Sequence, residues 1–137
     1  MISVVLTTYN ESLSDLESSV CSILNQTFHD IELIVIVDNP DADENILYLS
    51  SLDDPRMKLY VNDVNLGLVA SLNLGVQIAT GDYIARMDAD DISYATRLVD
   101  ELKFLKLHNL DIVASTFRTI DSEGRVISPP QCVAGCS

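Results

Sequence analysis

Three carboxylates follow an apolar segment in the middle of the chain, in the stretch Asp88-Ala89-Asp90-Asp91. Side chains alternate in an extended segment, so we expect Asp88 and Asp90 to point the same way and Ala89 to point the opposite way. Mg²⁺ or Mn²⁺ is commonly bound by one or two protein carboxylates, while water and substrate phosphate oxygens complete its shell. The spacing therefore predicts a metal site formed by Asp88 and Asp90, suited to a phosphate-bearing ligand.

Helix capping is the alternative role for these carboxylates, because Asp is a common N-cap residue. We assign that role to Asp91 or Ser93, ahead of a helix predicted by the spacing of Leu98, Leu102 and Leu105. A calcium loop of the EF-hand type is excluded. Counted from the first carboxylate, its sixth position holds Ser instead of Gly and its twelfth holds Val instead of Glu.

Other polar residues stand at the ends of the remaining predicted strands, and each has two interpretations. Asp38 is either a turn former or an acceptor for a base or ribose group. Tyr9 either stacks on a flat ring or packs against its loop, and Thr7 either hydrogen-bonds a ligand or only ends its strand. None of the three decides the function by itself.

Gly67 and Arg86 are also ambiguous. In Asn65-Leu66-Gly67-Leu68 the glycine allows close approach of the backbone to a ligand, or it marks an ordinary helix entry. Arg86 pairs either with a phosphate or with one of the many carboxylates. His29 and His108 have no Ser or Cys partner in a recognisable arrangement, and we interpret both as surface residues.

The elements that must position these residues alternate between strand and helix. Apolar, β-branched runs predict strands at 2–7, 31–37, 57–61, 83–87, 112–117 and 126–127. Helical spacing predicts helices at 14–25, 46–49, 68–79 and 98–105, the first starting with a capping box from Ser14 to Glu17. We therefore predict an α/β domain over residues 1–128, with a mostly parallel central sheet flanked by helices, and a loose tail at 129–137. Ligands bind such sheets beyond the carboxyl ends of the strands.

The chain is strongly acidic, with a formal charge of −13 over 137 residues and only eight Lys and Arg. This charge argues against nucleic acid as a partner, and it would repel an anionic ligand unless a cation intervened. No apolar run approaches the roughly 18 residues of a membrane-spanning helix, and the amino terminus does not resemble a signal peptide. We therefore expect a cytoplasmic protein.

The three cysteines are expected to be reduced thiols. Cys21 lies in a helical pattern, whereas Cys132 and Cys136 lie near the carboxyl terminus. A zinc site at the latter pair would need a third and a fourth Cys or His nearby, and the sequence has none.

Three ordered motifs resemble glycosyltransferase family 2, the inverting bacterial enzymes of the GT-A fold. They are SVVLTTYNE at 3–11, SILNQTF at 22–28 and IARMDADD at 84–91, and the resemblance extends from residue 2 to about 128. It implies a Rossmann-like GT-A nucleotide-binding domain, truncated before the half that binds the acceptor. It also implies a metal-dependent enzyme that transfers a sugar from a nucleoside diphosphate sugar, with a UDP-sugar favoured, to an acceptor hydroxyl.

The resemblance assigns roles to individual residues. Asp88 and Asp90 would hold Mn²⁺ or Mg²⁺ on the donor diphosphate, and Asp38 would face the base. The residues that it places at the nucleotide sugar are Thr7, Tyr9, Asp38, Asn65, Gly67 and Asp88, and we add Arg86 on the basis of its phosphate alternative. A glycan or glycolipid acceptor is implied, in cell-surface polysaccharide or lipopolysaccharide synthesis, with the full-length enzyme associated peripherally with the inner face of the cell membrane.

Two departures from the family pattern limit these expectations. The turn at 39–43 reads Asn-Pro-Asp-Ala-Asp where the family usually has a Gly-Ser-Thr-Asp type of turn, which leaves the loop shape and the base open. The family's general base is expected beyond residue 137, because Asp121 and Glu123 do not match its place. We expect the isolated chain to bind donor weakly and to turn over poorly or not at all.

Two non-enzyme alternatives remain at this point. A receiver-type signalling domain has similar length and acidity, but it resembles its family through acidic residues after strand one, where this chain has Thr7-Thr8-Tyr9-Asn10. A nucleotide-binding module without catalysis is the other alternative. A dinucleotide site is disfavoured, because no G-x-G-x-x-G motif follows the first strand.

Overall fold

The computed structural model of the chain describes residues 1–131. The chain divides into two compact units, Met1–Thr96 and Arg97–Ser137, which are described separately. Because the description ends at residue 131, most of the tail predicted at 129–137 lies outside the described residues, and so do Cys132 and Cys136. Cys21 is a free, exposed thiol, and His29 and His108 are exposed, as predicted.

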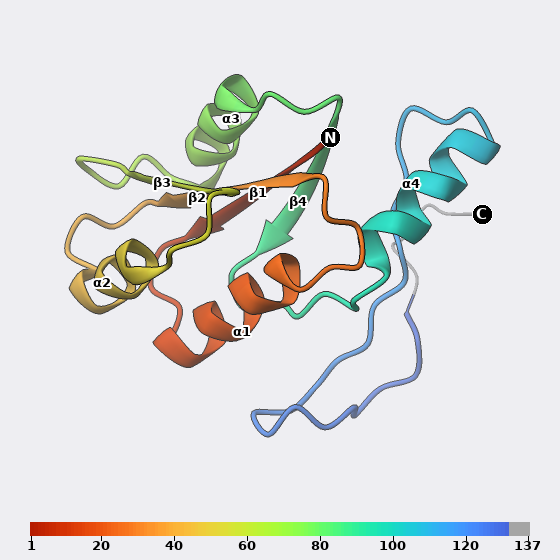
Figure 1. Cartoon of the computed structure of the whole chain (residues 1–137). Helices are drawn as coiled ribbons and strands as arrows, with labels where there is room; N and C mark the ends of the chain where they lie inside the picture. Colours follow the sequence, from red (N-terminus) through yellow and green to blue (C-terminus); the bar gives the residue numbers. More distant parts are fainter. Residues whose placement is uncertain (132–137) are drawn as a thin grey trace. The chain divides into compact units, whose positions relative to one another are not determined.

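The first unit is built on a parallel sheet of four strands in the order β3-β2-β1-β4. The strands are β1 (Ile2–Thr8), β2 (Ile31–Val37), β3 (Met57–Val61) and β4 (Tyr83–Asp88). Between them run α1 (Leu13–Leu24), α2 (Asp43–Ser51) and α3 (Leu68–Ile78). α3 covers one face of the sheet, and α1 and α2 cover the other (Figure 1). These four strands and three helices confirm the sequence predictions.

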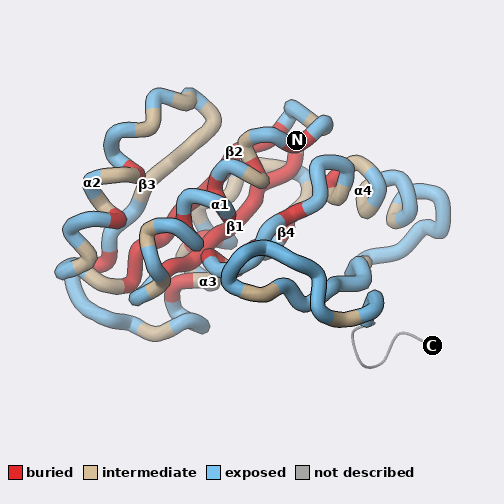
Figure 2. Tube along the Cα trace, turned by 90° about the horizontal axis from the view of Figure 1, so that it is seen from below, coloured by how far each residue is buried: buried red, intermediate tan, exposed pale blue. Residues whose placement is uncertain are grey.

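The two central strands form the core of this unit. Every residue of β1 and β2 is buried, and Figure 2 shows the buried residues gathered along these strands. A parallel strand covered on both faces needs a largely apolar run, which both sequences supply apart from Ser3, Glu32 and the two threonines that end β1. The predicted elements and the observed core therefore agree.

α3 approaches the sheet through its small residues. Ser71 and Gly75 are its buried residues, and a Cβ at Gly75 would overlap the Val5 side chain and press on Ile36. Leu68 and Val76, which marked this helix in the sequence, are about half exposed. The helix thus forms where it was predicted, but close packing turns its small face inward.

The capping box predicted for α1 is wrong by two residues. Ser12 is the N-cap, and its hydroxyl accepts a hydrogen bond from the Asp15 backbone N–H at 3.1 Å. Asp15 also accepts a hydrogen bond from the same hydroxyl at 2.7 Å. Ser12 and Asp15 have the cap-to-N3 spacing that was assigned to Ser14 and Glu17, so the pattern occurs twice and tertiary packing selects the earlier copy.

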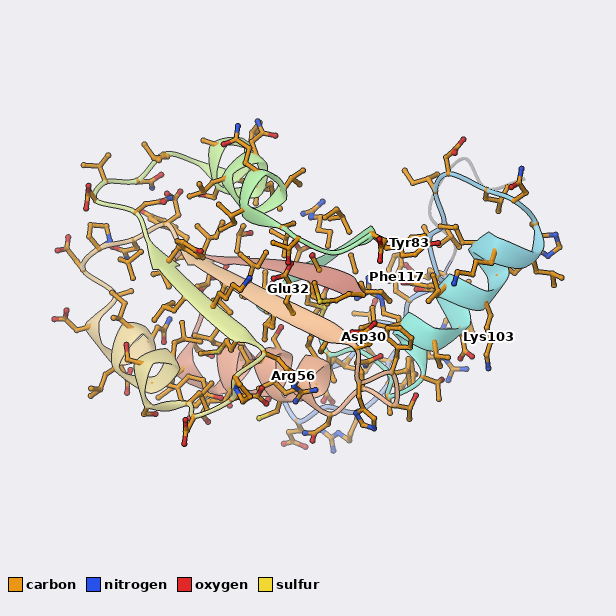
Figure 3. The ribbon with its side chains drawn as sticks, turned by 45° about the horizontal axis from the view of Figure 1, so that its top comes forward. Asp30, Glu32, Arg56, Tyr83, Lys103 and Phe117 are labelled. Atoms are coloured by element: carbon orange, nitrogen blue, oxygen red, sulfur yellow. The ribbon has the colours of Figure 1, made fainter. Side chains whose placement is uncertain are left out.

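The amino-terminal ends of the parallel strands form one edge of the sheet, the amino edge. It contains a buried carboxylate, Glu32, whose side chain is 5% exposed. It accepts hydrogen bonds from the Ser3 hydroxyl, from Lys58 Nζ at 2.6 Å and from the backbone N–H of Thr80 at 2.6 Å. Burial by itself raises the pKa of Glu32, but these donors outweigh it and hold the pKa at about 2. Glu32 thereby ties the connection between α3 and β4 to the sheet (Figure 3).

The second unit begins with α4 (Arg97–Leu107), which confirms the predicted helix. The strands predicted at 112–117 and 126–127 are wrong. Only two isolated antiparallel bridges occur there, Phe117 with Gln131 and Ile120 with Val126, and Ile112 is 85% exposed. β-branched residues favour a strand only where a neighbouring strand and a buried face are available. No helix among the described residues is both long and apolar enough to cross a membrane.

Candidate functional site

The carboxyl ends of β1, β2 and β4 lie at one edge of the sheet, and they bring predicted site residues together. Thr7 is the direct neighbour of Asp88 on β4 and of Ile36 on β2. Neighbours in register point to the same face, and Arg86, two residues before Asp88, shares that face. Thr7, Arg86 and Asp88 therefore gather on the α3 side of the sheet, since α3 packs on Val5 and Ile36 of this face.

Asp88 is the last residue of β4, and its main chain is held from two sides. Its carbonyl accepts hydrogen bonds from the hydroxyl of Ser19 on α1, at 3.0 Å, and from the backbone N–H of Asp91, at 3.2 Å. Ser19 is fully buried. The side chain of Asp88 stays 43% exposed. The fold thus fixes the backbone of this residue and leaves its carboxylate accessible.

The extended geometry predicted for Asp88-Ala89-Asp90 ends at Asp88, because residues 89 and 90 form a turn. Exposure still alternates: Ala89 is buried, whereas Asp88 is partly exposed and Asp90 exposed. Both carboxylates therefore have access to solvent, as a shared metal site requires.

The capping role predicted for Asp91 or Ser93 is wrong. The following helix begins only at Arg97, so neither residue borders it. The backbone N–H of Ser93 donates instead to the hydroxyl of Ser22 on α1, at 3.0 Å. The segment after β4 is thus attached to α1.

Arg86 forms an ion pair with Asp88, with 2.8 Å between Nη2 and Oδ1. Both side chains face solvent, at 56% and 43% exposure. Of the two partners that the sequence left open for Arg86, the structure shows a carboxylate. A guanidinium exposed to this degree can also reach other anions.

The donor set at this edge fits a metal that shares its shell with a ligand. The described residues contain no group of three His, Cys, Asp or Glu side chains able to hold a metal ion. Mg²⁺ and Mn²⁺ do not require such a cage, since one or two carboxylates suffice when phosphate oxygens and water complete the shell. Asp88 and Asp90 are the residues that would hold such an ion.

Asp38 lies directly after β2 and is 5% exposed. Its Oδ1 accepts hydrogen bonds from Asn62 Nδ2 at 2.7 Å and from the Leu66 backbone N–H at 2.8 Å, and its Oδ2 accepts from the Gly67 N–H at 2.7 Å. Burial raises the pKa of Asp38, but the donors from Leu66, Asn62 and Gly67 outweigh it and lower the pKa. Asp38 therefore holds the loop between β3 and α3 while carrying a charge.

Gly67 takes the conformation that this loop needs. It has φ 87° and ψ 162°, a region that side-chain-bearing residues rarely adopt. Its N–H points to Asp38 and also to Asn65 Oδ1, at 3.0 Å. Asn65, Gly67 and Asp38 thus form one hydrogen-bonded group, next to the first residue of α3.

An open hollow of about 340 Å³ lies between the loop after β1 and the loop after β2. Tyr9 lines it and is 45% exposed. Glu11 shapes its wall, since its Oε2 accepts hydrogen bonds from the Thr8 hydroxyl and the Tyr9 N–H, both at 2.7 Å. Asn45 Nδ2 in turn donates to the Glu11 carbonyl at 3.1 Å.

Sequence reasoning placed Tyr9 at the site but missed the residues that support it. Glu11 could have been found from the sequence, because it stands within the first motif and two residues after Tyr9. Asn62, which donates to Asp38, could also have been found, since it immediately follows β3. Ser19 could not have been found, because its contact with the Asp88 carbonyl joins residues far apart in the chain.

Comparison with known proteins gives consistent results. Residues 3–134 match the family model described as Glycosyl transferase family 2. An uncharacterized glycosyltransferase, MJ1057, of Methanocaldococcus jannaschii is 38% identical over 130 residues, which cover 93% of this chain and 45% of that protein.

Two solved structures share the fold. S. aureus TarS 1–349 in complex with UDP-GlcNAc superposes with a TM-score of 0.67 at 23% identity, covering 79% of this chain and 32% of that one. The mannosyltransferase PcManGT from Pyrobaculum calidifontis, in complex with GDP-Man and Mn²⁺, gives a TM-score of 0.66 at 23% identity, covering 76% and 32%. The predicted GT-A type of α/β fold is thus confirmed. The chain spans about half the length of the curated relative and about a third of each solved chain.

Proposed function

This chain belongs to glycosyl transferase family 2, and on that premise we propose that it supplies the donor-binding part of a glycosyltransferase. The reaction is the transfer of a sugar from a nucleoside diphosphate sugar to an acceptor hydroxyl. The observation that carries the proposal is Asp88, an accessible carboxylate on a fixed backbone at the carboxyl edge of a parallel sheet. Open α/β sheets bind their ligands at this edge.

The class of donor is supported by the ligands of the two structural neighbours. One is in complex with UDP-GlcNAc and the other with GDP-Man, so both hold a nucleoside diphosphate sugar. We propose a UDP-sugar as the favoured donor. The hollow beside Tyr9 has room for a flat ring, and an exposed tyrosine suits stacking.

Asp88 and Asp90 are proposed to hold Mn²⁺ or Mg²⁺, as the Mn²⁺ in one neighbour supports. A divalent ion bound there would stabilise the charge that develops on the departing nucleoside diphosphate. The charge of the protein gives an independent reason to propose a bound cation. With −13 overall, it would repel a diphosphate that arrived without a cation.

The remaining residues are proposed to orient the donor. Thr7 lies in register with Asp88 and can donate its hydroxyl to the ligand. Asp38 is proposed to face the base, within the hydrogen-bonded group that it forms with Asn65 and Gly67. Arg86 is proposed to contact the diphosphate, since its guanidinium is exposed on the same face.

The acceptor side is proposed to lie outside this chain. We place the general base that deprotonates the acceptor hydroxyl beyond residue 137, and a glycan or glycolipid of the cell surface as the acceptor. The full-length enzyme would then work in the cytoplasm, at the inner face of the membrane. The family match favours this reaction over a receiver-type signalling domain.

Calorimetric titration tests the proposal directly. UDP, GDP and dTDP are titrated into the chain with and without Mn²⁺. We expect one nucleotide to bind only with the metal, and Asp88→Asn to weaken that binding at least about tenfold, roughly 1.4 kcal/mol. Asp30→Asn is the matched control, because it removes an exposed carboxylate from the opposite edge of the sheet. Nucleotide binding that needs no metal, or equal binding by Asp88→Asn, would refute the metal site proposed at Asp88 and Asp90.

A further inference from the structure

Arg86 and Asp88 form a pair whose geometry bears on how a cation reaches the site. The two residues stand two positions apart on β4, so their side chains leave the same face of the strand. Arg86 Nη2 lies 2.8 Å from Asp88 Oδ1, so the guanidinium occupies one of the oxygens that a metal would use. A divalent cation and Arg86 therefore compete for the same carboxylate.

The competition is reversible because the pair is open to solvent. Exposed ion pairs contribute little stability, since water screens both charges and the side chains lose freedom when they pair. The Asp88 backbone does not move with its partner, because Ser19 and Asp91 hold its carbonyl. Only the Arg86 side chain has to swing for Asp88 to accept a cation.

We propose that Arg86 is a built-in counter-ion of Asp88 that couples the binding of the cation to the binding of the diphosphate. While the site holds no diphosphate, Arg86 neutralises Asp88 and weakens its hold on a bare divalent cation. When a metal–diphosphate complex arrives, the phosphate oxygens take over Arg86 and free Asp88 for the metal. This inference rests on the function proposed above.

The coupling predicts that removal of Arg86 changes two affinities in opposite directions: the affinity for a bare cation and the affinity for the metal–diphosphate complex. Without Arg86, a bare cation meets two uncompensated carboxylates and binds more tightly. The metal–diphosphate complex then lacks a guanidinium partner and binds less tightly. A residue that only stabilised the fold would shift both affinities in one direction.

The test compares Arg86→Gln with Arg125→Gln. Each variant lowers the net charge of −13 by one. Arg125 is the matched control because it also forms exposed ion pairs with carboxylates, Asp121 and Glu123, but belongs to the second unit. Mn²⁺ alone is titrated by the electron paramagnetic resonance signal of free Mn²⁺, and UDP is titrated by calorimetry in excess Mn²⁺. Arg86→Lys, which keeps the charge, is the conservative variant.

We expect Arg86→Gln to bind Mn²⁺ alone about threefold more tightly than Arg125→Gln, and UDP with Mn²⁺ about tenfold more weakly. Arg86→Lys should restore most of both values. If the wild type binds UDP with Mn²⁺ and Asp88→Asn binds it at least about tenfold more weakly, the proposed function stands. In that case equal Mn²⁺ affinity in the two Gln variants, or unchanged UDP affinity in Arg86→Gln, overturns only the inference about Arg86. If the wild type binds no nucleoside diphosphate with Mn²⁺, the proposed function fails and the inference with it.

Discussion

The two edges of the parallel sheet each contain a buried carboxylate, and each carboxylate holds a loop. At the amino edge Glu32 accepts from Ser3, Lys58 and Thr80, and so closes the connection into β4. At the carboxyl edge Asp38 accepts from Asn62, Leu66 and Gly67, and so shapes the entry into α3. Both acids are charged in the folded protein, because hydrogen-bond donors compensate for their burial.

The edges differ in what surrounds these acids. Around Glu32 the chain is tightly closed: a Cβ at Gly81 would lie 2.7 Å from the Ser3 hydroxyl and 2.9 Å from the Met1 carbonyl. Around Asp38 the neighbouring loops are open, and Tyr9 and Asp88 stay exposed. One sheet thus contains the same arrangement, a buried acid with several donors, within a closed region at one end and beside the open candidate site at the other.

Removal of Glu32 should have the largest effect on stability. We expect Glu32→Ala to lower the free energy of unfolding by about 4 kcal/mol, because Ser3, Lys58 and the backbone of Thr80 lose a buried charged partner. Urea denaturation followed by circular dichroism measures it. Asp30→Ala removes an exposed neighbour of Glu32 and should cost less than about 0.5 kcal/mol. Equal losses in the two variants would mean that the burial of Glu32 and its hydrogen-bond donors do not stabilise the amino edge.

The pH dependence of stability should show the same difference. The folded pKa of Glu32 is about 2, below its ordinary value of 4.5, so its contribution is complete above pH 4.5 and is lost as the pH falls toward 2. The gap in unfolding free energy between wild type and Glu32→Gln should therefore narrow over this range. Urea midpoints at pH 7, 4 and 3 measure the gap. If the difference in unfolding free energy stayed constant down to pH 3, the charge of Glu32 would not be the source of its contribution to stability.

Substitution of Asp38 should affect stability less and ligand binding more. We expect Asp38→Asn to lower the free energy of unfolding by about 2 kcal/mol, because an amide group faces N–H donors that need an acceptor. UDP affinity in Mn²⁺ should fall about tenfold, since the loop at Gly67 loses its anchor. Asp63→Asn, an exposed acid in the same loop, is the control. If Asp38→Asn lost stability but kept full affinity, the two edges would both be structural.

Much of the fold could be predicted from local patterns. The largely apolar runs of β1 and β2 predict strands that are covered on both faces, and both are fully buried. The same reasoning failed at 112–117, where an apolar, β-branched run forms no strand. A strand needs a partner, and no local pattern shows whether one is available.

The candidate site divides in the same way. The motifs pointed to Asp88 and Asp38 because both follow buried strands, and the parallel sheet does bring the ends of those strands to one edge. The partners of these acids could not be predicted. Leu66 and Gly67 reach Asp38 through backbone N–H groups, which every residue except proline has and which no side-chain pattern reveals.

The sequence by itself determined the alternation of strands and helices, the strong acidity of the chain, and the position of Asp88 after a buried strand. Those properties depend on side-chain hydrophobicity and charge, which are local. The tertiary structure decided that Arg86 pairs with Asp88, that Ser19 fixes its carbonyl, and that Glu32 and Asp38 carry charges in the interior. Those properties depend on which donors the folded chain brings within hydrogen-bonding distance, and most of these donors come from residues distant in sequence.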